Sequence, residues 1–201
     1  MSNSRSNTKL VSRDLITIAI FSVLFTLCLF VVAGVLGIFP LTMIFYGLVG
    51  GIPCGVIYMY MRAKIPKRGA IVLQALLVGI ILFGLGTIWT FALGTVIGGL
   101  LAEAISASGA YQSFKKNTTG YIVFMVCLWS GQIAPMLLMR DYYLAYSLQT
   151  GMSAEYIDTM LGFLSAPVFM AALIGTGIGA WLGALLGQKL LKKHFEKAGM
   201  L

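Results

Sequence analysis

The chain has 201 residues, of which 59% are hydrophobic and only 10% charged, and its mean hydropathy is +0.95. Soluble globular domains carry about 25% charged residues, so the composition excludes an ordinary soluble protein and predicts one integral membrane domain, residues 1–201. The formal net charge is +8. Because the basic residues lie between hydrophobic segments, this charge is typical of membrane topology, and we expect no nucleic-acid partner.

Six apolar segments follow one another along the chain, each close to the roughly 20 residues that a membrane-spanning helix needs. We therefore predict an all-α bundle of six transmembrane helices. The predicted spans cover residues 15–36, 41–61, 70–85, 89–105, 120–139 and 167–186. Ser12 is expected to cap the first helix, and Pro53 to kink the second.

The basic residues alternate with the predicted spans. With six spans, both termini, the loop from Arg62 to Arg68 and the loop holding Lys115 and Lys116 share one face. Every Lys and Arg except Arg140 lies on that face. The positive-inside rule then predicts a protein of the cell membrane with both termini in the cytoplasm, embedded in the lipid bilayer.

The long outer connection from Arg140 to Ser165 contains a short periodic segment. Hydrophobic residues recur there at four-residue spacing: Met152, Tyr156, Met160 and Leu164. With Ser153 available as a cap, the pattern predicts a short amphipathic helix. This helix could lie flat on the membrane surface or fold over the bundle as a lid, and the sequence leaves both open.

The sequence offers no recognisable catalytic set. The sole histidine, His194, lies in the basic carboxyl-terminal tail, and the six acidic residues are scattered. Serine-hydrolase, zinc-protease and phosphate-loop motifs are absent, and the three cysteines lie inside apolar spans. We therefore expect no enzymatic activity, no metal site and no cofactor.

Polar and small residues near the helix ends have simple structural interpretations. Glu103 is expected to pair with a basic residue, and Gln74 to lie at the membrane interface. Glycines recur in the fourth and sixth spans: Gly94, Gly98, Gly99, Gly175, Gly179, Gly183 and Gly187. Such spacing lets helices approach closely, so we expect packing within the bundle, with a surface for another membrane protein as the alternative.

The fifth span and the sequence after it supply the candidate binding site. A polar residue within the hydrocarbon is costly unless it faces a cavity or a partner, and Gln132 lies about 18 Å along its helix, in the outer half of the membrane. The candidate substrate-binding residues are Trp129, Gln132, Met136, Arg140, Tyr142, Tyr143, Tyr146, Thr87 and Trp89. The alternatives are an interfacial aromatic belt and a local Arg140–Asp141 ion pair.

Four stretches carry a resemblance to a known family: KLVSRDLITIAIFSVLF, the GGIP at Gly50 to Pro53, the MRDYYLAY at Met139 to Tyr146, and GALLGQKLLKKHFEKAG near the end. With six short spans and no nucleotide-binding domain, the chain resembles the substrate-binding S components of energy-coupling factor (ECF) transporters. It is most similar to the Trep_Strep group among them. The resemblance covers nearly the whole chain.

The resemblance implies a function in nutrient uptake. An S component captures a small-molecule trace nutrient from outside and docks on a T component that carries two cytoplasmic ATPases. Docking in such proteins uses small residues of the first helix, which correspond here to Ala19, Ser22, Val23 and Thr26. These residues do not form the clean alanine pair of the family pattern.

The substrate remains open in the sequence. Haem or a related tetrapyrrole is one candidate, because Met136, Met139, Tyr142 and Tyr143 suit a flat apolar ligand and tyrosine can ligate haem iron. The absence of an outer histidine counts against a His-ligated haem. Two other functions remain as alternatives: a stand-alone secondary transporter or channel, and a structural membrane protein held by its glycine faces.

Overall fold

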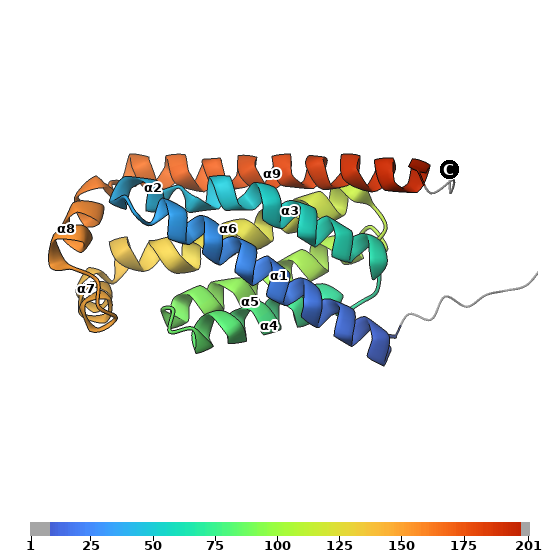
Figure 1. The fold of residues 1–201 in the computed structure, drawn as a ribbon, viewed down its shortest axis with the longest axis horizontal. Coiled ribbons are helices and arrows are strands. Elements are labelled where there is room, and N and C mark those ends of the chain that lie inside the picture. The colour runs from blue at the N-terminus through green and yellow to red at the C-terminus, as the bar shows by residue number, and fades with distance from the viewer. Residues whose placement is uncertain (1–8, 198–201) are drawn as a thin grey trace, which may run out of the picture.

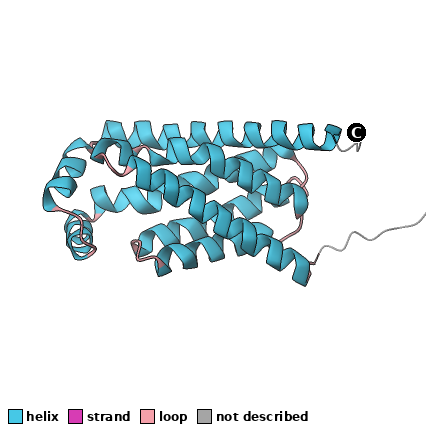
Figure 2. Cartoon of the chain, viewed as in Figure 1, coloured by secondary structure: helices cyan, strands magenta, loops and turns pink. Residues whose placement is uncertain are grey.

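The structure is a computed structural model that describes residues 9–197, with side chains described through Lys192. The side chain of His194 therefore lies outside the described residues. Within the described part the chain is helical with short connecting loops and contains no strand, as Figure 2 shows. The prediction of an all-α protein is confirmed.

Nine helices make up the described chain. They are α1 (Ser12–Leu36), α2 (Pro40–Ile44), α3 (Tyr46–Lys64), α4 (Ala70–Gly84), α5 (Trp89–Ala107), α6 (Phe114–Leu138), α7 (Arg140–Gln149), α8 (Ala154–Phe163) and α9 (Ala166–Lys197). Figure 1 shows the long helices running side by side, with α7 and α8 across one end of the bundle. The first residue of α1 and the last of α9 lie at the opposite end.

Among the described residues, four helices are long and apolar enough to cross a membrane: α1, α5, α6 and α9 as far as Lys192. The helix α4 is apolar but shorter, with 15 residues. The chain is thus a multi-pass membrane protein by length and composition. The third to sixth predicted spans correspond to α4, α5, α6 and α9, although α6 and α9 extend further toward the basic end than predicted.

The second predicted span, 41–61, is not one helix. It divides into α2 and α3 at Phe45, whose φ of −95° and ψ of 10° interrupt the helix. The carbonyl of Ile44 accepts a hydrogen bond from the indole Nε1 of Trp129, at 2.9 Å. The amide of Leu48 donates instead to Phe45, at 3.1 Å. A side chain from α6 thus diverts the carbonyl that a continuous helix would use.

Glycines bring the helices of the bundle into backbone contact, as expected for packing. A Cβ on Gly183 of α9 would lie 2.3 Å from the carbonyl oxygen of Gly51 in α3, and one on Gly179 would meet the carbonyl of Leu48. In α5, a Cβ on Gly94 would lie 2.5 Å from the carbonyl oxygen of Cys127 in α6. The α3–α9 and α5–α6 interfaces therefore depend on residues without side chains.

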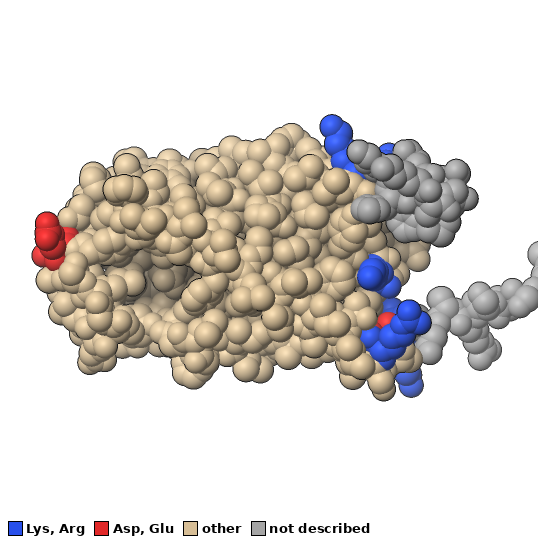
Figure 3. Space-filling model, viewed as in Figure 1, with Lys and Arg blue, Asp and Glu red and all other residues tan. Residues whose placement is uncertain are grey.

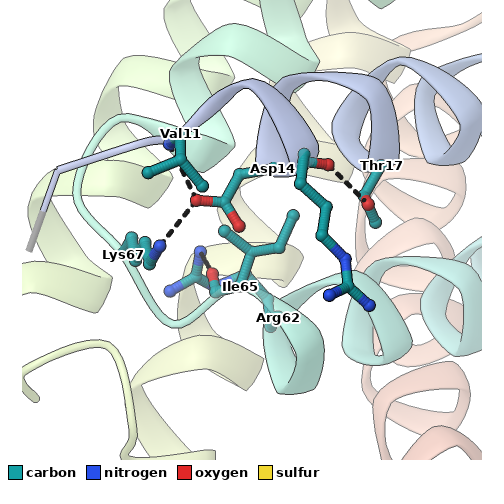
Figure 4. Close-up of polar contacts among 7 residues, drawn as sticks. Val11, Asp14, Thr17, Arg62, Ile65 and Lys67 are labelled. Carbon is teal, nitrogen blue, oxygen red and sulfur yellow. Dashed lines mark hydrogen bonds and ion pairs between the residues drawn. The ribbon is translucent and has the colours of Figure 1, made fainter. Parts of the chain in front are cut away.

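The basic end is closed by a contact between the start of α1 and the loop after α3 (Figure 4). A carboxylate oxygen of Asp14 accepts from the Val11 amide at 3.0 Å and pairs with the Lys67 ammonium at 2.6 Å. Val11, not Ser12, therefore precedes the helix, because the Asp14 side chain satisfies the free amide there. The prediction that Ser12 is the cap is wrong.

Three further polar side chains lie near this end. Glu103 accepts from the backbone amides of Gly69 at 2.6 Å and Ile71 at 3.2 Å, so it caps the start of α4 and does not form the predicted ion pair. Gln74 is 1% exposed, so its amide packs inside the bundle, and its placement at the depth of the membrane interface stays a prediction. The guanidinium of Arg62 is also buried, and its Nη1 donates to the Ile65 carbonyl at 2.9 Å (Figure 4).

A candidate solute pocket at the end opposite the basic residues

A pocket of about 520 Å³ opens where helices α1 to α6 meet α7 and α8. Figure 3 shows a hollow in this half of the surface, while the Lys and Arg side chains gather at the other end. The residues that line the pocket are Leu29, Phe30, Ala33, Gly34, Gly37, Met43, Tyr46, Leu82, Thr87, Phe91, Gln132, Tyr143, Met152, Ser153, Tyr156 and Met160. Ligand sites in proteins have about this volume, roughly 300–1,000 Å³.

The pocket wall is apolar, aromatic and rich in sulfur, and none of its lining residues is Asp, Glu, Lys, Arg or His. Its aromatic members are Phe30, Tyr46, Phe91, Tyr143 and Tyr156, and its thioethers are Met43, Met152 and Met160. Rings and thioethers offer large contact areas to flat apolar molecules. A small number of polar groups on such a wall is the usual composition of a small-molecule site.

Two polar atoms on lining side chains have no hydrogen-bond partner in the described part of the chain. They are Oη of Tyr46 and Oε1 of Gln132, and both are shielded from bulk solvent. A buried polar atom without a partner costs free energy, and in native proteins such atoms are uncommon. Other buried polar atoms of the described chain also have no partner, but these two lie on side chains of the pocket wall, where a bound molecule could supply the missing hydrogen bonds.

Tyr143 reaches the pocket from α7, a helix that the sequence did not reveal. It is 2% exposed, and burial raises the pKa of its phenol to about 12. The phenol therefore stays protonated at neutral pH and adds no charge to the wall.

The helix α8 covers the outer side of the pocket. Ser153 caps it by accepting from the Tyr156 amide at 3.2 Å, as predicted, and Met160 and Leu161 are buried against the bundle. The hydroxyl of Tyr156 donates to the Gly37 carbonyl after α1, at 2.7 Å. Of the two positions that the sequence left open, the structure shows the one folded over the bundle, where Met152, Tyr156 and Met160 line the pocket.

Three of the predicted site residues line the pocket: Gln132, Tyr143 and Thr87. The hydroxyl of Thr87 already donates to the Leu82 carbonyl at 2.8 Å, so it fixes the turn between α4 and α5. Gln132 is thus the predicted residue that combines a place in the wall with an unpartnered polar atom.

The other six predicted residues do not line the pocket. Trp129 and Met136 are buried in the core, where the Trp129 ring lies 5.1 Å from that of Phe169. Arg140, Tyr142 and Trp89 are exposed, and Tyr146 donates its hydroxyl to the Gly86 carbonyl. The reason is the turn at Met139, which starts α7 with Tyr143 and Ser147 facing inward and Arg140 and Tyr142 outward.

Arg140 and Asp141 also do not form the local ion pair considered as an alternative. Among the described residues the recorded ion pair joins Lys67 to Asp14. Both Arg140 and Asp141 are exposed at the start of α7.

Sequence reasoning missed the residues that α1, α2 and α3 contribute. Phe30, Ala33 and Met43 carry no polar signal in an apolar span, so periodicity alone cannot separate a pocket wall from a lipid-facing surface. Tyr46 could have been found, because its hydroxyl lies inside a predicted span, the criterion that selected Gln132.

The face of α1 predicted to meet a T component is only partly available. Ser22 is 0% exposed and Thr26 is 3% exposed, and each donates its hydroxyl to the carbonyl four residues earlier. These two residues pack inside the bundle, so their assignment to a docking surface is corrected. Val23 is exposed and Ala19 is half-buried.

Comparison with known proteins gives one match. A family model described as a hypothetical bacterial integral membrane protein (Trep_Strep) matches residues 12–197. Neither the curated proteins nor the solved structures include a match to the chain.

Proposed function

The chain belongs to the Trep_Strep family of hypothetical bacterial integral membrane proteins, and we propose that it captures a small solute for uptake into the cell. Its role would be that of the S component of an ECF importer: it binds the solute from outside and passes it inward. The observation that carries the proposal is the 520 Å³ pocket, which lies at the end opposite the cations and is covered by α8.

The charge distribution supports an outward-facing pocket. Lys64, Lys67, Lys115 and Lys189 all belong to the end where α1 begins and α9 finishes. By the positive-inside rule that end faces the cytoplasm, so the pocket and α8 face the outside. The exposed acids Glu155 and Asp158 of α8 agree with this orientation.

Energy for uptake would come from partners. The sequence has no phosphate-binding loop, so ATP would be hydrolysed by two ATPase subunits attached to a T component. The chain would contribute solute recognition only, without enzymatic activity of its own.

A secondary transporter or channel is less well supported. Such a protein couples to ions through ionisable groups at mid-membrane or through a polar path across both leaflets. In the described chain the charged residues of α1, α3, α5 and α6 lie in the turns nearest the basic end. The residues that line the pocket all lie toward the end of the bundle covered by α7 and α8, so the pocket offers no path across both leaflets.

Haem remains the second candidate for the solute, because Met43, Met160 and Tyr143 line the pocket and could approach a flat macrocycle. One observation weighs against it: the lining residues include no cation for the two haem carboxylates.

Co-purification tests the proposed function. The tagged full-length chain is extracted from bacterial membranes, and native mass spectrometry identifies what stays bound. We expect a retained small molecule and, under mild extraction, a membrane partner with two ATPase subunits. Ion-driven uptake by the chain alone in liposomes, with neither partner nor retained solute, would falsify the proposal.

A further inference from the structure

The two unpartnered polar atoms of the pocket lie on side chains of α3 and α6. Tyr46 is the first residue of α3 and follows the helix break at Phe45. At that break the Trp129 indole donates to the Ile44 carbonyl. Gln132 follows Trp129 by about one turn of α6. The Trp129 side chain thus contacts the segment just before Tyr46 and lies about one turn from Gln132 on α6.

These two atoms have different hydrogen-bonding capacities. Oε1 of Gln132 accepts only, whereas the Tyr46 hydroxyl can both donate and accept. A molecule that satisfies both must present a donor to Gln132 and a second polar group to Tyr46. Each satisfied atom removes a desolvation cost that the empty pocket carries, so such a molecule gains affinity from both.

The rest of the wall limits the charge of the solute. A charged group that enters an apolar site loses its hydration and needs a counter-ion there. The pocket lining contains no ionisable acid, base or histidine, and its Tyr143 phenol stays neutral. The surrounding rings and thioethers favour a flat ring as the apolar part of the solute.

On these grounds, and resting on the proposed capture function, we infer that the solute is uncharged, contains a flat ring, and is selected by hydrogen bonds to Gln132 and Tyr46. Ring amides, imides and hydroxylated heteroaromatic rings have this chemistry. Molecules that present a carboxylate or phosphate to the pocket do not.

The inference predicts opposite effects on stability and on binding for two substitutions. Tyr46→Phe and Gln132→Leu each remove a buried polar atom that has no partner in the chain, so the ligand-free protein should unfold at the same or a higher temperature. Binding should weaken about tenfold in each, because a polar group of the solute loses its partner. A merely structural role would lower the unfolding temperature instead.

A matched control is available in α4. The Gln74 amide is also buried without partners, but Gln74 does not line this pocket. Gln74→Leu should therefore match Gln132→Leu in its effect on unfolding and leave binding unchanged.

Two dyes that differ by one charge provide the probes. N-phenyl-1-naphthylamine is uncharged, flat and has one N–H donor, and 8-anilino-1-naphthalenesulfonate is the same molecule with a sulfonate. Binding to the full-length protein in detergent is followed by energy transfer from tryptophan, and the variants correct for dye in micelles. We expect saturable binding of the uncharged dye, weakened about tenfold by Gln132→Leu, whose Oε1 accepts from the dye N–H, and little changed by Tyr46→Phe, because the dye has no second polar group. Binding of the sulfonate should be at least tenfold weaker.

Three results overturn the inference: no saturable binding of the uncharged dye, equal binding of the two dyes, or unchanged binding of the uncharged dye in Gln132→Leu. The proposed function fails separately. A retained natural solute that is charged, haem included, leaves capture intact and contradicts this inference. Selective binding of the uncharged dye without any retained solute or ATPase partner supports the pocket chemistry and contradicts capture.

Discussion

The α3–α9 interface and the space under α8 differ in what lies between the helices. Along the α3–α9 interface, glycines bring the two backbones into contact, as at Gly183 against Gly51. Under α8, rings and thioethers surround a hollow, and the Tyr46 and Gln132 side chains of its wall keep unpartnered polar atoms. The interface gains stability from close packing, whereas the space under α8 leaves room and hydrogen-bonding capacity for another molecule.

The largest effect should follow from adding a methyl group to the α3–α9 interface. In Gly183→Ala the new Cβ would lie 2.3 Å and 2.5 Å from the carbonyl oxygens of Gly51 and Ile52. Separation of α3 from α9 should cost about 3 kcal/mol, measured by thermal or denaturant unfolding in detergent.

The matched control for this change lies on the same helix. A Cβ on Gly177 would meet its nearest neighbour, Ile122, at 3.8 Å, so Gly177→Ala should be tolerated. Equal destabilisation by both changes would mean that close backbone contact does not account for the stability of the α3–α9 interface.

The next effect concerns the helix break at Phe45, which lies beside the pocket residue Tyr46. Trp129→Phe keeps a ring beside Phe169 but leaves the buried Ile44 carbonyl without its donor. We expect a loss of about 1–3 kcal/mol in unfolding and weaker binding of the uncharged dye, because Tyr46 follows the break directly. Trp181→Phe, at a half-exposed position of α9, should change neither measurement. Unchanged binding of the uncharged dye in Trp129→Phe would show that the pocket does not depend on this helix break.

A smaller effect should come from the contact between α8 and α1. Tyr156→Phe removes the hydrogen bond of 2.7 Å to the Gly37 carbonyl, worth about 1 kcal/mol. If α8 must move for the solute to leave, stopped-flow dissociation of the uncharged dye should become about fivefold faster. The control is Tyr142→Phe, which alters an exposed phenol of α7 outside the pocket. Identical release rates would show that α8 does not gate this pocket.

The smallest effect is expected at the surface of the basic end. Asp14→Asn removes the ion pair with Lys67 but keeps an oxygen that can accept from the Val11 amide. The unfolding temperature should fall slightly at low ionic strength and match the unmodified chain at high ionic strength, because the pair is only half-buried and salt can still screen it. A decrease that persists in high salt would indicate that this contact stabilises the basic end more strongly than a solvent-screened pair can.

The sequence predicted which end of the bundle holds the pocket more accurately than it predicted the residues of the pocket wall. Gln132 was identified because an amide in a hydrocarbon span is costly, and that argument is independent of the helix packing. Arg140 and Tyr142 were chosen because they follow Gln132 along the chain, but the turn at Met139 directs them to the surface. Proximity in sequence does not determine which face of a following helix points inward.

Composition and periodicity by themselves determined that this is a helical membrane protein, that its cations gather on one side, and that Ser153 begins an amphipathic helix. These properties depend on hydrophobicity, charge and local hydrogen bonding, which are visible residue by residue. Only the tertiary structure decided that the second span breaks at Phe45, that α8 lies over the bundle, and that Tyr46 joins Gln132 in one pocket. Each depends on a contact between distant segments, such as the indole of Trp129 on the Ile44 carbonyl, 85 residues away.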